Sequence, residues 1–218
     1  MTQNLHTSTP TATPAPPQRR DYISGSALIV GAVCFLPSGL LHPEPGDGTE
    51  LQRIHEMVTD PMWIPSAALA LVAFACFAIA FARLSVAADP LGRVLRWGAV
   101  TSAAVAAGQL VYLFGGLGAE PLARDEANWF SWVMFATHLF VNPAWGLAVA
   151  AIALVGGLSR RLVGPVGLVV GLVGGLSWTV SMLTAPYLDI DDVLFPIAGT
   201  LLTGWMVALG VRLLRRSR

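Results

Sequence analysis

Six nearly continuous apolar stretches run along the chain, and short polar segments separate them. The stretches cover residues 23–42, 62–84, 95–117, 129–158, 162–187 and 193–214. A helix that crosses a bilayer needs about 20 apolar residues in a row, and each stretch meets this requirement. The pattern therefore predicts an all-α, polytopic membrane protein with six transmembrane helices.

Charged residues are sorted between alternate polar segments. Of the 13 arginines, all but Arg53 and Arg124 fall at the chain ends or around the second and fourth connections between spans. Of the 13 acidic residues, all but Asp21 and Asp89 fall in the first, third and fifth connections. Because arginine-rich loops stay on the cytoplasmic side of a membrane, we expect both the N-terminus and the C-terminus to be cytoplasmic.

The composition fits a single membrane domain. Hydrophobic residues make up 55% of the chain and charged residues 12%, which is too little polar surface to cover a soluble globule. We predict a six-helix transmembrane domain over residues 23–214, preceded by a disordered cytoplasmic Pro/Thr-rich tail over residues 1–22. A basic cytoplasmic tail follows over residues 215–218. Richness in Arg, Ala and Gly is typical of a GC-rich genome, so we expect a bacterial, multi-pass protein of the cell (cytoplasmic) membrane.

Residue usage argues against several kinds of chemistry. Every basic residue is arginine, so no lysine can form a Schiff base or complete a Walker-type phosphate loop. The chain has no basic stripe of the kind that binds nucleic acid. Cys34 and Cys76 lie within apolar stretches and lack the spacing of a redox or metal motif, so we expect inert, buried thiols.

The first outer connection, residues 43–61, predicts a short amphipathic helix. Thr49 and Gln52 have the spacing of a capping box, and Leu51, Ile54 and Val58 supply an apolar side. That side would rest on lipid or on the mouth of the bundle. The helix could simply order the loop or could act as a lid over a site.

Glycines recur at every fourth residue along the fifth span, at Gly167, Gly171 and Gly175. Such a stripe lets a neighbouring helix approach to backbone contact distance. We interpret it as a packing feature without chemistry of its own.

His138 is the one ionisable side chain deep within a predicted span. Asn142 follows one turn later, and Trp145 lies on the same face at i+7. Pro143 has no N–H, which leaves the carbonyl of Leu139 without its usual helical donor. Polar side chains are costly in a bilayer, so this kinked spot is a candidate site. Hydrogen bonds from His138 and Asn142 to a neighbouring helix would explain it equally well.

Polar residues on other spans are predicted at a similar depth beneath the outer surface. We therefore infer an outward-facing polar and aromatic pocket that binds a small, lipophilic ligand. Its predicted ligand-binding residues are His42, Gln109, Tyr112, His138, Asn142, Trp145 and Ser177.

Imidazoles and carboxylates are expected around the rim of this pocket, where they suit acid–base chemistry, a divalent metal or plain solvation. The candidate catalytic residues are His138, Asp189, Asp192 and Glu56. No metal-ligand set is predicted, and the cofactor stays open, with a haem between His42 and His138 as one conceivable case.

Three functional hypotheses follow. The first is binding, sensing or transport of a lipophilic small molecule; in its six spans, outward site and surface helix, the chain resembles the substrate-capturing subunits of energy-coupling transporters, without their motifs. The second is a membrane-embedded enzyme for acid–base isomerisation, cyclisation or hydrolysis of a lipophilic substrate. The third is an accessory subunit with no ligand of its own. The expected partners are the lipid bilayer and either another membrane protein or a second copy of the chain, with no nucleic acid.

Overall fold

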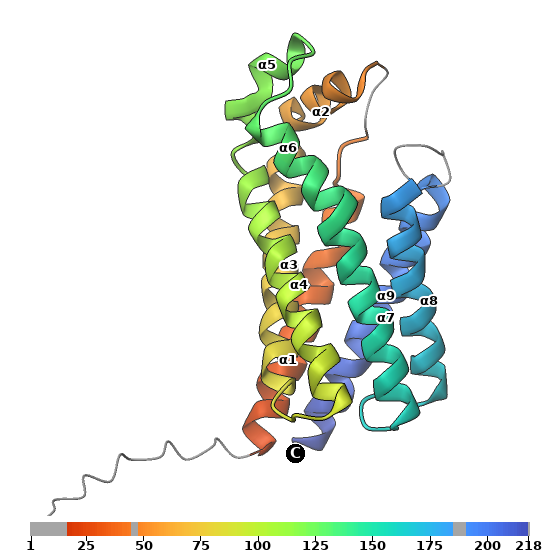
Figure 1. Cartoon of the computed structure of the whole chain (residues 1–218). Coiled ribbons are helices and arrows are strands. Elements are labelled where there is room, and N and C mark those ends of the chain that lie inside the picture. Colours follow the sequence, from red (N-terminus) through yellow and green to blue (C-terminus); the bar gives the residue numbers. More distant parts are fainter. Residues whose placement is uncertain (1–16, 45–47, 185–190, 218) are drawn as a thin grey trace, which may run out of the picture.

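The computed structural model describes residues 17–44, 48–184 and 191–217, and within them the regular structure is helical (Figure 1). The helices are α1 (Pro17–Leu40), α2 (Glu50–Thr59), α3 (Trp63–Leu84), α4 (Pro90–Tyr112), α5 (Ala119–Ala123), α6 (Trp129–Ala136), α7 (Asn142–Leu158), α8 (Pro165–Thr184) and α9 (Asp191–Arg216). A 3₁₀ turn, η1 (Gly115–Gly118), precedes α5, and a π-helical turn, η2 (Thr137–Val141), joins α6 to α7.

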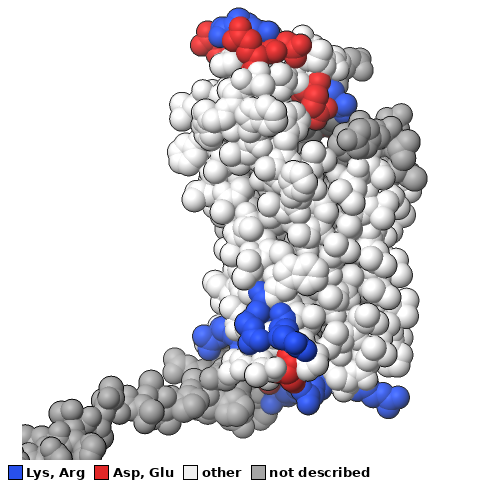
Figure 2. All heavy atoms as spheres, in the orientation of Figure 1, with Lys and Arg blue, Asp and Glu red and all other residues white. Residues whose placement is uncertain are grey.

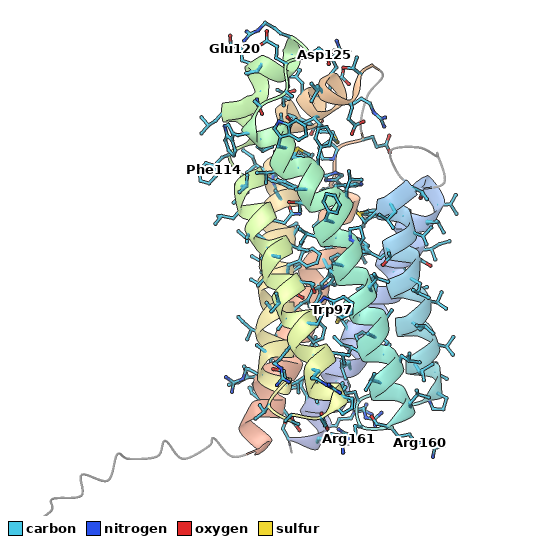
Figure 3. All side chains as sticks on the ribbon, in the orientation of Figure 1. Trp97, Phe114, Glu120, Asp125, Arg160 and Arg161 are labelled. Atoms are coloured by element: carbon cyan, nitrogen blue, oxygen red, sulfur yellow. The ribbon has the colours of Figure 1, made fainter. Side chains whose placement is uncertain are left out.

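Six of these helical segments are long and apolar enough to span a membrane, as expected of a multi-pass membrane protein. They are Asp21–Leu40, Trp63–Leu84, Pro90–Tyr112, Trp129–Leu158, Pro165–Thr184 and Val193–Arg216. The predicted number of spans is thus confirmed. On the face drawn in Figure 2, charged side chains lie at the two ends and leave an uncharged band between them. We call the end with Arg160 and Arg161 the arginine-rich end, and the end with Glu120 and Asp125 the acidic end (Figure 3).

The third span begins earlier than the sequence pattern suggested. Its helix starts at Pro90 instead of residue 95 and ends at Tyr112 instead of residue 117. The Asp89 side chain accepts a hydrogen bond from the Gly92 N–H at 2.8 Å, and proline is favoured at the first helical position. These two start signals shift the helix towards its N-terminus by about one turn.

Helix extends into both of the regions predicted as tails. α1 begins at Pro17, within the predicted tail 1–22, and α9 continues to Arg216. Proline suits the first turn of a helix, and arginines stabilise the negative end of the helix dipole. Residues 1–16 lie outside the described part of the chain.

The six spans form a closed ring. Each span packs on the next, and α9 packs on α1 (Figure 1). At that closing seam Gly25 and Gly210 face each other, since a Cβ on either would lie 2.7 Å from the other's carbonyl oxygen. The centre of the ring is filled by a buried apolar core that includes Phe35, Phe77 and Trp145.

The amphipathic connection folds as predicted and caps the bundle at the acidic end. Thr49 and Gln52 form a reciprocal capping box. Ile54 and Val58 are buried and belong to a second apolar cluster with Trp63 and other residues of the bundle end. The apolar side of α2 therefore rests on protein, and of the two surfaces expected for it, the bundle mouth is the one observed.

Asp89 makes the arginine-rich end sensitive to acid. Its carboxylate caps α4 and pairs with Arg161 in the turn between α7 and α8. The Gly92 N–H and then Arg161 hold the pKa of Asp89 below its ordinary value. A carboxyl group with a lowered folded-state pKa stabilises the fold above its ordinary pKa, near 4, and this contribution is lost as the pH falls through the folded-state value.

We therefore expect the melting temperature of the protein in detergent to fall as the pH is lowered from 6 to 3, and Asp89→Asn to flatten part of that fall. Asparagine keeps the helix cap but carries no charge, so it is the matched replacement. If the melting temperatures of Asp89→Asn and of the unaltered protein fell by the same amount over this pH range, the assignment would be contradicted.

Candidate functional site

The fourth span changes its helical repeat where the candidate site was predicted. Between α6 and α7 the chain makes one π-helical turn, and the Asn142 N–H bonds to the Thr137 carbonyl five residues earlier. Pro143 cannot donate to Leu139, so the regular pattern is broken at this position. The interruption predicted at Pro143 is thereby confirmed, and π turns within helices are frequent at functional sites.

The π turn presents polar side chains to the bundle. His138 is half-buried and Asn142 is buried. Thr137 is buried against α4, where a Cβ on Gly108 would meet its side chain at 2.7 Å. Gly108 therefore lets the widened turn sit close to α4.

His42 lies just beyond the end of α1, near the acidic end of the bundle. Its Nδ1 is 3.5 Å from the Ser66 Oγ, and its ring centroid is 5.7 Å from that of Trp63. The residue as a whole is exposed, but protein atoms surround its ring, and loss of solvation and, second, the charge on His138 lower the pKa of His42 to about 4. His42 is consequently a neutral imidazole at pH 7, able to accept or donate one hydrogen bond.

Tyr112 is built into the apolar cluster under α2. Its ring packs against Trp63, with centroids 5.6 Å apart, and against Phe130 at 6.3 Å. The Trp63 indole donates to the Tyr112 carbonyl at 2.8 Å. The structure thus gives Tyr112 a packing environment beneath the cap.

Trp145 is fully enclosed. Its indole N–H donates to the Ser102 hydroxyl at 3.0 Å, and its ring stacks on Phe77 with an interplanar angle of 19°. With 0% of the residue exposed, Trp145 belongs to the closed core.

The remaining predicted residues are dispersed. Gln109 on α4 and Ser177 on α8 are half-buried, and neither side chain hydrogen-bonds to another residue in the described part of the chain. Glu56 is exposed on the outer side of α2. Asp189 and the side chain of Asp192 lie outside the described residues.

Two buried donors lie on α8. Trp178 and Ser181 are 5% and 0% exposed, and in the described part of the chain neither the indole Nε1 nor the hydroxyl has a hydrogen-bond partner. A buried polar group without a partner is costly. Thr179 between them is satisfied, because its hydroxyl donates to the carbonyls of Pro143 and Gly175.

Packing contacts and hydrogen bonds connect Trp178 with His42. The Trp178 ring lies 5.3 Å from Phe35 on α1, and the Phe35 carbonyl accepts a hydrogen bond from Ser38 at 2.7 Å. Ser66 donates to the Ser38 carbonyl at 2.8 Å and adjoins His42. Ser66 was missed at the sequence level, although its place one turn into the second span is the kind of signal that singled out the other polar residues.

The arrangement offers hydrogen-bonding groups at the edge of an aromatic core. Among the described residues, no group of three or more His, Cys, Asp or Glu side chains could hold a metal ion. Comparisons with protein-family models, with curated proteins and with solved structures found no match.

Proposed function

We propose that the protein binds a small, lipophilic molecule carrying at least one hydrogen-bonding group in the half of the bundle nearer the acidic end. The site lies between the end of α1, the π turn and α8, with His42, His138, Trp178 and Ser181 as its polar contacts. The observation that carries the proposal is the pair of buried, unpartnered donors on α8. A ligand acceptor would satisfy them, while the surrounding aromatic rings would hold its apolar body.

The orientation is part of the same proposal. With the arginine-rich end in the cytoplasm, both termini are cytoplasmic and the site opens towards the outer face of a bacterial cell membrane. Binding, sensing and transport all use such a site, and the hydrogen-bonding groups alone do not select among them.

Native mass spectrometry of the protein extracted from its own membranes tests the binding site. We expect a co-purifying small molecule whose retention falls about fivefold or more in Trp178→Phe and in Ser181→Ala, because a neutral hydrogen bond contributes roughly 1 kcal/mol. Trp97→Phe is the matched control, since Trp97 is 41% exposed on α4. Removing the unpartnered hydroxyl in Ser181→Ala should leave the ligand-free melting temperature unchanged or slightly raised, whereas Trp178→Phe also removes ring atoms from the core and should lower it.

Two outcomes would argue against this site. One is an extracted protein that carries no small molecule in any preparation, as an accessory subunit would. The other is a bound molecule whose retention is the same in Trp178→Phe, Ser181→Ala and Trp97→Phe.

Acid–base catalysis on a lipophilic substrate is the second candidate, and the neutral state of His42 favours it. A neutral imidazole close to a hydroxyl can take up a proton during a reaction. His42→Gln separates the two candidates. An enzyme would lose turnover and still hold its substrate. A binding protein would show a change only in how much of the co-purifying small molecule it retains.

A further inference from the structure

A groove lies between α8 and α9 at the arginine-rich end, far from the site described above. It has a volume of about 180 Å³. It is lined by Leu162, Val163, Gly164, Gly167, Trp205, Ala208, Leu209 and Arg212. A shallow apolar depression lies on α8. It is lined by Pro165, Val166, Val169 and Val170.

Small residues open this groove. A Cβ added to Gly164 would have no neighbour within 4 Å, and Ala208 is exposed on the facing side of α9. Trp205 is held in place because its indole donates to the Gly167 carbonyl at 2.8 Å. The groove is therefore shaped by residues of α8 and α9 that are held in place.

Among the described residues that line the groove, Arg212 is the charged one. It is half-buried on α9, and no carboxylate in the described part of the chain forms a salt bridge with it. Arg124, by contrast, is paired with Glu120, and Arg161 with Asp89. A guanidinium at the edge of an apolar region is costly unless an anion compensates it, so Arg212 calls for a negative partner from outside the chain.

The surroundings of the groove are strongly basic. Arg215 and Arg216 follow on the same helix and are exposed. The Arg216 guanidinium donates to the Arg161 carbonyl at 2.9 Å, which draws the end of α9 towards the α7–α8 turn. Of the two acids at this end, Asp89 is already engaged by Arg161, and Asp21 on α1 forms no salt bridge with the arginines of α9 in the described part of the chain. Positive potential is thus concentrated at the mouth of an apolar groove.

We propose that this groove binds an anionic phospholipid. The phosphate pairs with the Arg212 guanidinium, which presents several donors in a planar fork suited to phosphate. One acyl chain lies along the apolar surface of α8 that includes Val166 and Val169, which are 76% and 55% exposed. Basic pockets between membrane helices are recognised binding places for such headgroups. This inference does not depend on the ligand site proposed at the acidic end.

The test compares lipid retention in nanodiscs of defined composition. Full-length protein is reconstituted into phosphatidylcholine with a minor fraction of phosphatidylglycerol, released, and analysed by native mass spectrometry. We expect phosphatidylglycerol to be retained in excess of its share, and the excess to fall about fivefold in Arg212→Gln, the amount expected for one interfacial arginine. Ala208→Phe, which fills the groove without changing charge, should reduce the excess as well.

Arg93→Gln is the matched control, since it removes an exposed arginine of α4 outside the groove. Its melting temperature and that of Arg212→Gln in pure phosphatidylcholine show whether each variant is folded. Equal losses of phosphatidylglycerol in the two variants would mean diffuse attraction by charge and would overturn the proposal. So would retention in proportion to the bulk lipid, or full suppression of the excess by millimolar inorganic phosphate, which would indicate a site for the free anion instead.

Discussion

Replacing Trp145 with alanine should lower the free energy of unfolding by about 3–5 kcal/mol, the cost of deleting a large side chain from a closed core. Trp145 touches Phe35, Phe74, Phe77 and Trp178, with ring centroids between 4.9 and 6.0 Å apart. Its loss would also leave the Ser102 hydroxyl without its donor. Unfolding in mixed micelles with increasing sodium dodecyl sulfate measures the change.

Trp132→Ala is the matched control for this prediction, because Trp132 is 65% exposed on α6 and its loss opens no cavity. We expect Trp132→Ala to shift the unfolding midpoint only slightly. If the two alanine variants unfolded at the same detergent fraction, Trp145 would not be the centre of the core.

Gly175→Val is the substitution with the second-largest expected effect. A Cβ at Gly175 would lie 2.6 Å from the Gly146 carbonyl oxygen and 2.8 Å from the Ala150 nitrogen. Both are backbone atoms, so α7 and α8 would have to move apart. Overpacking of this kind costs about 1–3 kcal/mol, occasionally more, and we expect a correspondingly lower midpoint in the same unfolding experiment.

Gly204→Val provides the control, since a Cβ at Gly204 would meet no atom within 4 Å. Any loss of stability that the two variants share would reflect the low helix propensity of valine and not the contact between α7 and α8. A Gly175→Val protein as stable as Gly204→Val would show that α8 can shift at no cost.

The sequence predicted features that depend on position along the chain. The six spans follow from the length of the apolar runs, the α2 cap from Thr49 and Gln52, and the break in the fourth helix from Pro143. Close approach was expected at three glycines of α8. Gly171 and Gly175 do face neighbouring helices, whereas the nearest atoms to a Cβ at Gly167 belong to Val163 just before the helix.

The sequence could not predict which way each side chain faces. A helix in lipid is apolar on all sides, so hydrophobic periodicity carries little information about its inner face. Depth alone placed Trp145 beside Ser177 in one pocket, although Trp145 is enclosed and Ser177 is half-buried. The burial of Trp178 and Ser181 and their lack of a hydrogen-bond partner became visible only in the structure.

The contact between α1 and α9 has a consequence for biosynthesis. One flank of the first span, around Gly25, is covered by the last span, around Gly210. While the ribosome is still producing the intervening helices, that flank must be covered by lipid or by the insertion machinery. Assembly of the ring can therefore finish only after the sixth span has entered the bilayer, and a nascent chain arrested before α9 would keep an open, glycine-lined side.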